Sequence, residues 1–485
     1  MITRSSGVLM PVSALPTSGG IGTLGIEAFR FADWLKKSGQ RYWQVLPIGP
    51  QGKADSPYQP LSAFAGCELY IDLERLFKDG LLFEYELPQG ESRYVNYAAV
   101  RRERMNLLRL AFSRFSPDEK FTEFCKDNAS WLDGYANFAA IRRQYNGAPL
   151  AKWKTQDRVY SPSVIERWGD KIKEDADFYK FCQYRFMTDW DILHKYCANS
   201  GVQIVGDLPI YVSPDGADVW SYPEQFQLDA DYKPSNIAGV PPDAFSETGQ
   251  RWENPLYDWE RMADSDFSWW KMRIYEAAKM FDAVRIDHFI GFARYYSIPA
   301  DSETAINGRW RRGPGRKLID AINSVRGDMD IIAENLGVLH PSVCRLLDYT
   351  GYHGMNVMEF AFGDEGQPFT FSKNSVVYGA THDNDTLLGW FNSLDEQTAD
   401  FVSDYIGAKS KSGVRDALLR TIYALPCDIA VLQTQDLLWL GSSARMNTPG
   451  TTVGNWRWRM SKDSLTDSLA EKLNKYSKLY GRWEK

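Results

Sequence analysis

Short apolar runs recur along the chain and alternate with amphipathic stretches over most of its length. The run at 7–16 ends in turn residues, and the stretch at 26–39 after it has helical spacing and stops at Gly39. A second short strand follows, which is the opening of a β-α-β unit. The predicted strands, about eight in all, lie near 7–16, 42–50, 201–212, 281–291, 329–337, 353–362, 375–385 and 427–441.

The alternation lapses in one long interval, between about residues 69 and 200. The stretches at 100–115 and 131–147 are charged, amphipathic and helical in spacing. We therefore expect three parts. These are residues 1–68, with the first barrel strands and a substrate loop; residues 69–200, a mostly helical inserted subdomain; and residues 201–485, the rest of the barrel and a terminal helix.

About eight strands that alternate with helices are typical of a (β/α)₈ barrel. A doubly wound sheet is the alternative. It is disfavoured because the chain has neither a G-x-G-x-x-G nor a G-x-x-x-x-G-K-[ST] loop. The predicted fold is therefore an α/β barrel with a large helical insertion.

Charge and cysteine content narrow the possible partners and locations. The net charge of −7 disfavours binding to nucleic acid or to anionic lipid. No apolar run approaches the roughly 20 residues of a membrane span, and the N-terminal segment lacks the apolar core of a signal peptide. The six cysteines form no C-x-x-C pair, and the five histidines form no H-E-x-x-H motif. We expect a cytoplasmic protein with free thiols and no zinc.

Four of the apolar runs end on a carboxylate. In a parallel barrel the carboxyl ends of all strands open onto one face, so these acids are expected around one pocket. Each acid alone is also explained as a helix cap or a solvent-facing group. The four acids are Asp207, Asp287, Glu334 and Asp383.

Two of these acids have surroundings that favour opposite charge states. Arg285 and Asp287 are two residues apart on a strand and point to the same side, so the guanidinium is expected to keep Asp287 charged. Glu334 follows an apolar run and faces other acids, which favours its protonated form. A charged and a neutral carboxyl group roughly 5 to 5.5 Å apart are what retaining glycoside chemistry requires.

Several motifs carry a resemblance to a known family. "RIDH", "AENLG" and "THDND" resemble strand-end motifs of the α-amylase superfamily. Together with "LPTSGGIGTLG", "DSPYQPLSAFAG", "GDLPIYV" and "GVPPDAFSETGQRW", they resemble the amylomaltase, or 4-α-glucanotransferase (disproportionating enzyme), family. The resemblance extends from about Gly7 to past Trp456, and implies a barrel without the C-terminal β-sandwich of most amylases.

The resemblance also implies roles for individual residues. Asp287 is implied as the nucleophile, Glu334 as the general acid and base, and Asp383 as a third carboxylate that binds sugar hydroxyls. Tyr58, Trp252 and His382, taken without this context, are as readily explained as structural residues. The implied substrate-binding residues are Tyr58, Asp207, Trp252, Arg285, Asn335, His382 and Asp364.

One stretch, "RWENP", departs from the family pattern. Trp252 matches the tip of a mobile loop, at about 241–252, that covers the glucan. Glu253 stands where the family usually has glycine, and a glutamate there could stiffen the loop or alter acceptor binding.

The implied reaction moves segments of α-1,4-glucans to the 4-hydroxyl group of an acceptor glucan or glucose. It needs no metal or organic cofactor, and we expect a monomer or weak homo-oligomer. Three alternatives stay open on the sequence. They are an α-glucan hydrolase with the same residues, a metal-dependent barrel enzyme of the enolase type, and a glucan-binding protein without activity.

Overall fold

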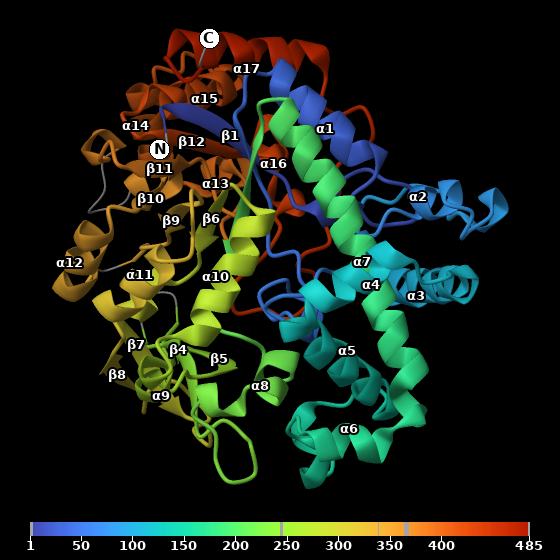
Figure 1. The fold of residues 1–485 in the computed structure, drawn as a ribbon. Coiled ribbons are helices and arrows are strands. Elements are labelled where there is room, and N and C mark those ends of the chain that lie inside the picture. Colours follow the sequence, from blue (N-terminus) through green and yellow to red (C-terminus); the bar gives the residue numbers. More distant parts are fainter. Residues whose placement is uncertain (1–2, 243–245, 338, 363–367, 484–485) are drawn as a thin grey trace.

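A closed parallel barrel forms the centre of the molecule (Figure 1). The computed structural model describes residues 3–242, 246–337, 339–362 and 368–483. Each barrel strand overlaps one of the predicted apolar runs, which confirms the (β/α)₈ barrel. The barrel strands are β1 (Ser5–Leu9), β2 (Tyr42–Gln44), β3 (Gln203–Leu208), β6 (Ala283–Ile286), β9 (Asp330–Ala333), β10 (His353–Val357), β11 (Ser375–Tyr378) and β12 (Ile429–Gln433).

The pairing of the strands aligns their carboxyl ends. In the parallel pair of β3 and β6, Asp207 lies opposite Arg285, and in the pair of β6 and β9, Arg285 lies opposite Ile332. The strands are buried on both sides, which explains why their sequences are runs of apolar residues rather than alternating ones.

Helices surround the barrel (Figure 1). They turn an apolar side to the strands, as in α1, where Phe31 and Leu35 are buried. The helices outside the insertion are α1 (Ile26–Lys37), α8 (Ala217–Ser221), α9 (Trp259–Asp264), α10 (Ser268–Met280), α11 (Arg316–Asn323), α12 (Pro341–Thr350), α13 (Leu387–Ser393), α14 (Glu396–Ile406), α15 (Val414–Ala424), α16 (Thr434–Leu437) and α17 (Asp467–Leu479). None of the described helices is both long and apolar enough to cross a bilayer.

The segment between β2 and β3 is helical, as its sequence indicates. Its long helix α7 packs on α5, and the chain then enters β3. In Figure 1 these helices extend from one side of the barrel. They are α2 (Leu73–Lys78), α3 (Tyr97–Arg114), α4 (Glu119–Asp127), α5 (Ala129–Gln144), α6 (Pro162–Trp168) and α7 (Asp170–Asn199).

A second, antiparallel sheet was not predicted from the sequence. It has the strand order β5-β4-β7-β8 and lies near one end of the barrel (Figure 1). The expected mobile loop is therefore partly a hairpin, and Trp252 belongs to a strand rather than to a loop tip. Glu253 beside it has a φ of +66°, in the left-handed region. The strands are β4 (Asn236–Val240), β5 (Gln250–Pro255), β7 (Arg294–Pro299) and β8 (Arg309–Arg312).

The first and last described segments of the chain contact each other. β1 pairs with β12 and closes the barrel. Beyond α17, the buried guanidinium of Arg482 donates hydrogen bonds to the carbonyl groups of Ser5, Tyr423 and Leu425. The described residues after β12 form no further strand.

Candidate active site

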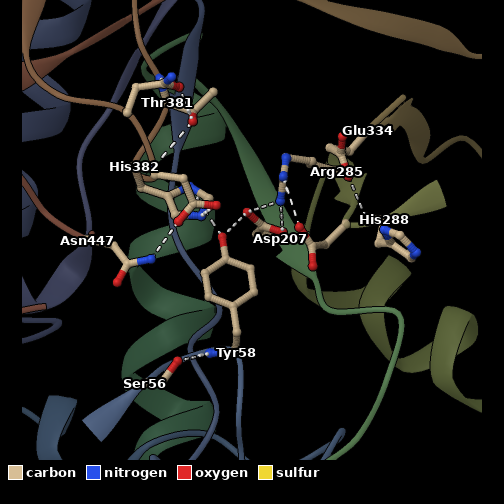
Figure 2. A network of polar contacts seen from close by, with 12 residues as sticks. Ser56, Tyr58, Asp207, Arg285, His288, Glu334, Thr381, His382 and Asn447 are labelled. Carbon is tan, nitrogen blue, oxygen red and sulfur yellow. Dashed lines mark hydrogen bonds and ion pairs between the residues drawn. The ribbon is translucent and has the colours of Figure 1, made fainter. Parts of the chain in front are cut away.

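Arg285 lies between two carboxylates at the ends of β3 and β6 (Figure 2). Its Nη1 atom is 2.9 and 3.0 Å from the two carboxylate oxygens of Asp207, and its Nη2 atom is 2.9 Å from Oδ1 of Asp287. The side chain of Asp207 is fully buried, whereas that of Asp287 is 28% exposed. The buried charges in this strand are thus paired, and Asp287 is the member open to a ligand.

Glu334 follows β9 and is held by two backbone groups. The amide of His288 donates to Oε2 at 2.8 Å, and the amide of Leu336 donates to Oε1 at 2.7 Å. Burial raises the pKa of Glu334 to about 7; nearby Asp287 adds to this shift, while Arg285 and the backbone amides oppose it. A carboxyl group with this pKa can both give and take a proton near neutral pH.

His288 is a site residue that was not predicted from the sequence. It has a φ of +50°, and its ring is buried against Trp252 with the ring centroids 4.8 Å apart. Burial lowers the pKa of His288 to about 4, so the ring is neutral. His288 directly follows Asp287, and the left-handed turn at His288 lets its backbone amide donate to the carboxyl group of Glu334. The His288 amide therefore links the two acids.

Asp383 is fixed by neighbours from two parts of the chain. His382 Nε2 is 3.4 Å from Oδ2 of Asp383, and Asn447 Nδ2 is 2.6 Å from its Oδ1. Arg445 donates to the backbone carbonyl of Asp383. Burial alone would raise the pKa of Asp383, but His382 and the hydrogen bond from Asn447 lower it well below its usual range. Arg445 and Asn447 were not predicted from the sequence, since they lie in a polar, turn-rich segment after β12.

Tyr58 connects the two groups of acids (Figure 2). Its hydroxyl group donates to Oδ2 of Asp207 at 2.7 Å. Its ring stacks on His382 at a centroid distance of 4.9 Å and also contacts Trp456. Six expected site residues therefore belong to one connected network: Asp207, Arg285, Asp287, Tyr58, His382 and Asp383.

The other expected binding residues differ in their placement. The Trp252 ring contacts His288, so it lies beside the acids. The side-chain oxygen of Asn335 accepts a hydrogen bond from the Met355 amide of β10 at 2.7 Å, which ties the end of β9 to the next strand. Asp364 lies outside the described residues.

Fold and site together define a class of protein. A carboxylate held by arginine, a second carboxyl group with a pKa near neutrality and a third carboxylate lie at one end of a parallel barrel. These are the functional groups that a barrel enzyme needs to act on glycosidic bonds.

Known proteins similar to this chain narrow this class of barrel enzyme to one family. A family model described as 4-alpha-glucanotransferase matches residues 10–466. The 4-alpha-glucanotransferase of Streptococcus pneumoniae serotype 4 is 41% identical and aligns over 99% of this chain and 98% of its own. The chloroplastic/amyloplastic enzyme of Arabidopsis thaliana is 39% identical over 99% of this chain and 86% of its own.

A solved structure agrees with this result. The amylomaltase of Streptococcus agalactiae, determined in complex with acarbose, superimposes with a TM-score of 0.96 and 37% identity, and covers 99% of this chain and 100% of its own. The chain belongs to the 4-alpha-glucanotransferase family. Its activity is the transfer of α-1,4-glucan segments, which is favoured over hydrolysis and over the non-catalytic alternative.

Proposed function

We propose that transfer proceeds by a retaining double displacement with Asp287 as the nucleophile. The ion pair between Arg285 and Asp287, beside a carboxyl group with a pKa of about 7, is the observation that carries this proposal. Asp287 attacks the anomeric carbon of the donor while Glu334 protonates the departing glycosidic oxygen. The second step reverses these roles: Glu334 takes the proton from the 4-hydroxyl group of the acceptor, which displaces Asp287.

The remaining expected residues are proposed to bind the donor. The exposed side of Asp383, with His382 beside it, is suited to accept hydrogen bonds from sugar hydroxyls. Tyr58 and Trp252 offer aromatic faces, and Asp207 and Arg285 hold the nucleophile. The S. agalactiae relative was solved in complex with acarbose, which supports a sugar-like ligand for this chain. Asn335 and Asp364 complete the proposed set.

Acceptor sugar must compete with water for the glycosyl enzyme. The hairpin of β4 and β5 brings Trp252 against His288, next to Asp287. In this position it is suited to exclude water and hold the acceptor, which raises the effective concentration of the 4-hydroxyl group. The steps use only side chains of the protein, and no cofactor is part of the proposal.

Three further points extend the proposal. Residues 69–200 form an inserted subdomain, with barrel parts at 1–68 and 201–485. The protein acts as a monomer or weak homo-oligomer on glucan donors and on glucan or glucose acceptors. It works in the cytoplasm, which the six free thiols support because reducing compartments preserve them.

Incubation with maltotriose tests the chemistry. We expect glucose together with a ladder of longer glucans whose new bonds are α-1,4 by ¹H NMR. Asp287→Asn and Glu334→Gln should each lose at least about 100-fold in kcat. New β-linked bonds, or an Asp287→Asn variant with full activity, would refute the mechanism. Hydrolysis to glucose and maltose alone would instead count against the transfer step.

A further inference from the structure

A large open groove lies outside the acid network described above. It has a volume of about 1030 Å³ and is lined by β8, by α9 and by the starts of α11 and α12. Figure 1 places these elements together on one side of the molecule, at the β8 edge of the antiparallel sheet. The volume is at the upper end of the range for small-molecule sites and would hold a ligand of several rings.

The groove gathers positive charge in a chain whose net charge is −7. Among the residues described, Glu260 is the one acidic residue in its lining, and no ion pair joins any lining cation to a carboxylate. Like charges that are not paired repel one another, so the cluster costs free energy in the absence of an anion. Its six members are Arg294, Arg311, Arg312, Arg316, Lys317 and Arg345.

Aromatic side chains lie among these cations. The guanidinium of Arg294 sits 4.0 Å from the centre of the Trp310 ring, and Trp310 remains 37% exposed. Trp259, the first residue of α9, also lines the groove. Indole rings of this kind provide flat surfaces for sugar rings, and a guanidinium group binds phosphate oxygens in a bidentate manner.

The backbone of the groove is fixed before any ligand binds. The Gly313 amide donates to the Ala293 carbonyl at 3.0 Å, and the Gly315 amide donates to the Phe292 carbonyl at 2.9 Å. A side chain at Gly313 would come within 2.3 Å of the Phe292 carbonyl oxygen, so the turn packs directly on the segment that follows Asp287. The turn leads into α11, which has no side-chain cap at its start.

We propose that this groove binds a phosphate ester of a carbohydrate, either a small sugar phosphate or a phosphorylated glucan. The cations and the start of α11 would bind the phosphate group, and Trp310 would contact the sugar. The size of the groove and the negative charge of the rest of the protein disfavour an extended polyanion such as RNA. The proposal concerns a binding site, and it does not depend on the roles assigned to Asp287 or Glu334.

Calorimetric titration tests the proposal directly. The probes are glucose 1-phosphate, a phosphorylated maltodextrin, the same maltodextrin after phosphatase treatment, maltotriose and inorganic phosphate. We expect at least one of the two phosphate esters to bind, with an affinity that falls as salt rises. Glucose 1-phosphate binding identifies a free sugar phosphate, whereas binding of the phosphorylated maltodextrin alone identifies the glucan-borne group.

A matched pair of triple variants separates the groove from general electrostatics. Arg311→Gln, Arg312→Gln and Arg316→Gln together should weaken phosphate-ester binding at least tenfold. The control, Arg102→Gln, Lys120→Gln and Lys126→Gln, removes the same charge from α3 and α4 and should leave the affinity within about twofold. Circular dichroism checks that both variants fold.

Three results would overturn the proposal. The first is that neither phosphate ester binds the wild-type protein. The second is an equal loss of affinity in both triple variants. The third is inorganic phosphate binding as tightly as the esters, which would leave no role for the sugar.

Discussion

Arg285 and Asp287 form an ion pair at the carboxyl end of β6, with Nη2 of the arginine 2.9 Å from Oδ1 of the aspartate. The other terminal nitrogen of the guanidinium contacts Asp207, whose side chain is fully buried. One arginine therefore satisfies a buried acid and orients an exposed one. This explains why an otherwise apolar strand carries two charged residues.

Removal of the arginine should be costly because it leaves Asp207 buried without a cation. We expect Arg285→Leu to lower the free energy of unfolding by about 3–5 kcal/mol, measured by urea denaturation. Adding Asp207→Leu should restore much of this loss, since apolar side chains then replace the pair, while transfer activity stays abolished. A double variant no more stable than the single one would contradict this account.

The pKa of Glu334, about 7, predicts how activity depends on pH. Above pH 7 the carboxyl group loses the proton that it must give to the glycosidic oxygen, so kcat/KM for maltotriose should fall about tenfold per pH unit. An α-maltotriosyl fluoride donor is the control, because fluoride leaves with little help from an acid. The fall should be much weaker with the fluoride, and an equal fall would assign the titration to another group.

Asn447 should act by orienting Asp383. Its side chain donates to Oδ1 of Asp383 at 2.6 Å, and a hydrogen bond to a charged group contributes about 1.5–3 kcal/mol. We expect Asn447→Ala to lower kcat/KM about ten- to a hundredfold, and Asn447→Asp to lower it further by repulsion. Asn455→Ala is the matched control from the same segment. A comparable loss in that control would point to a general disturbance of the segment.

Glu253 should be strained by its own backbone. A non-glycine residue at a φ of +66° costs about 1 kcal/mol. We therefore expect Glu253→Gly to leave stability unchanged or raise it by up to about 1 kcal/mol, and Glu253→Val to lower it, because a β-branched side chain fits this region poorly. Denaturant unfolding of both variants gives the comparison. A destabilised glycine variant would show that contacts of the glutamate outweigh the strain.

The barrel could be predicted from the sequence because its strands are buried on both sides. Such strands are continuous apolar runs, and acids at their ends stand out against them. The antiparallel sheet could not be predicted in this way. All four residues of β8 are exposed, and β5 includes the exposed Glu253 at a bend, so neither strand shows an apolar run or a regular alternation.

The site residues that lie at the carboxyl ends of barrel strands could be predicted from the sequence. Asp207, Asp287 and Glu334 belong to this group. Asn447 does not, because it lies in a polar segment and reaches Asp383 only through the folded chain. His288 was missed because its importance comes from a left-handed turn, which sequence spacing does not reveal.

The dependence of the site on late segments has a consequence for protein synthesis. Asn447 and Trp456 complete the surroundings of Asp383 and Tyr58, and Arg482 ties the final turn to the first strand. A nascent chain on the ribosome can have all the proposed catalytic acids and still lack a working centre. Stop codons placed between Asp383 and Arg482 should therefore be as damaging as much earlier ones.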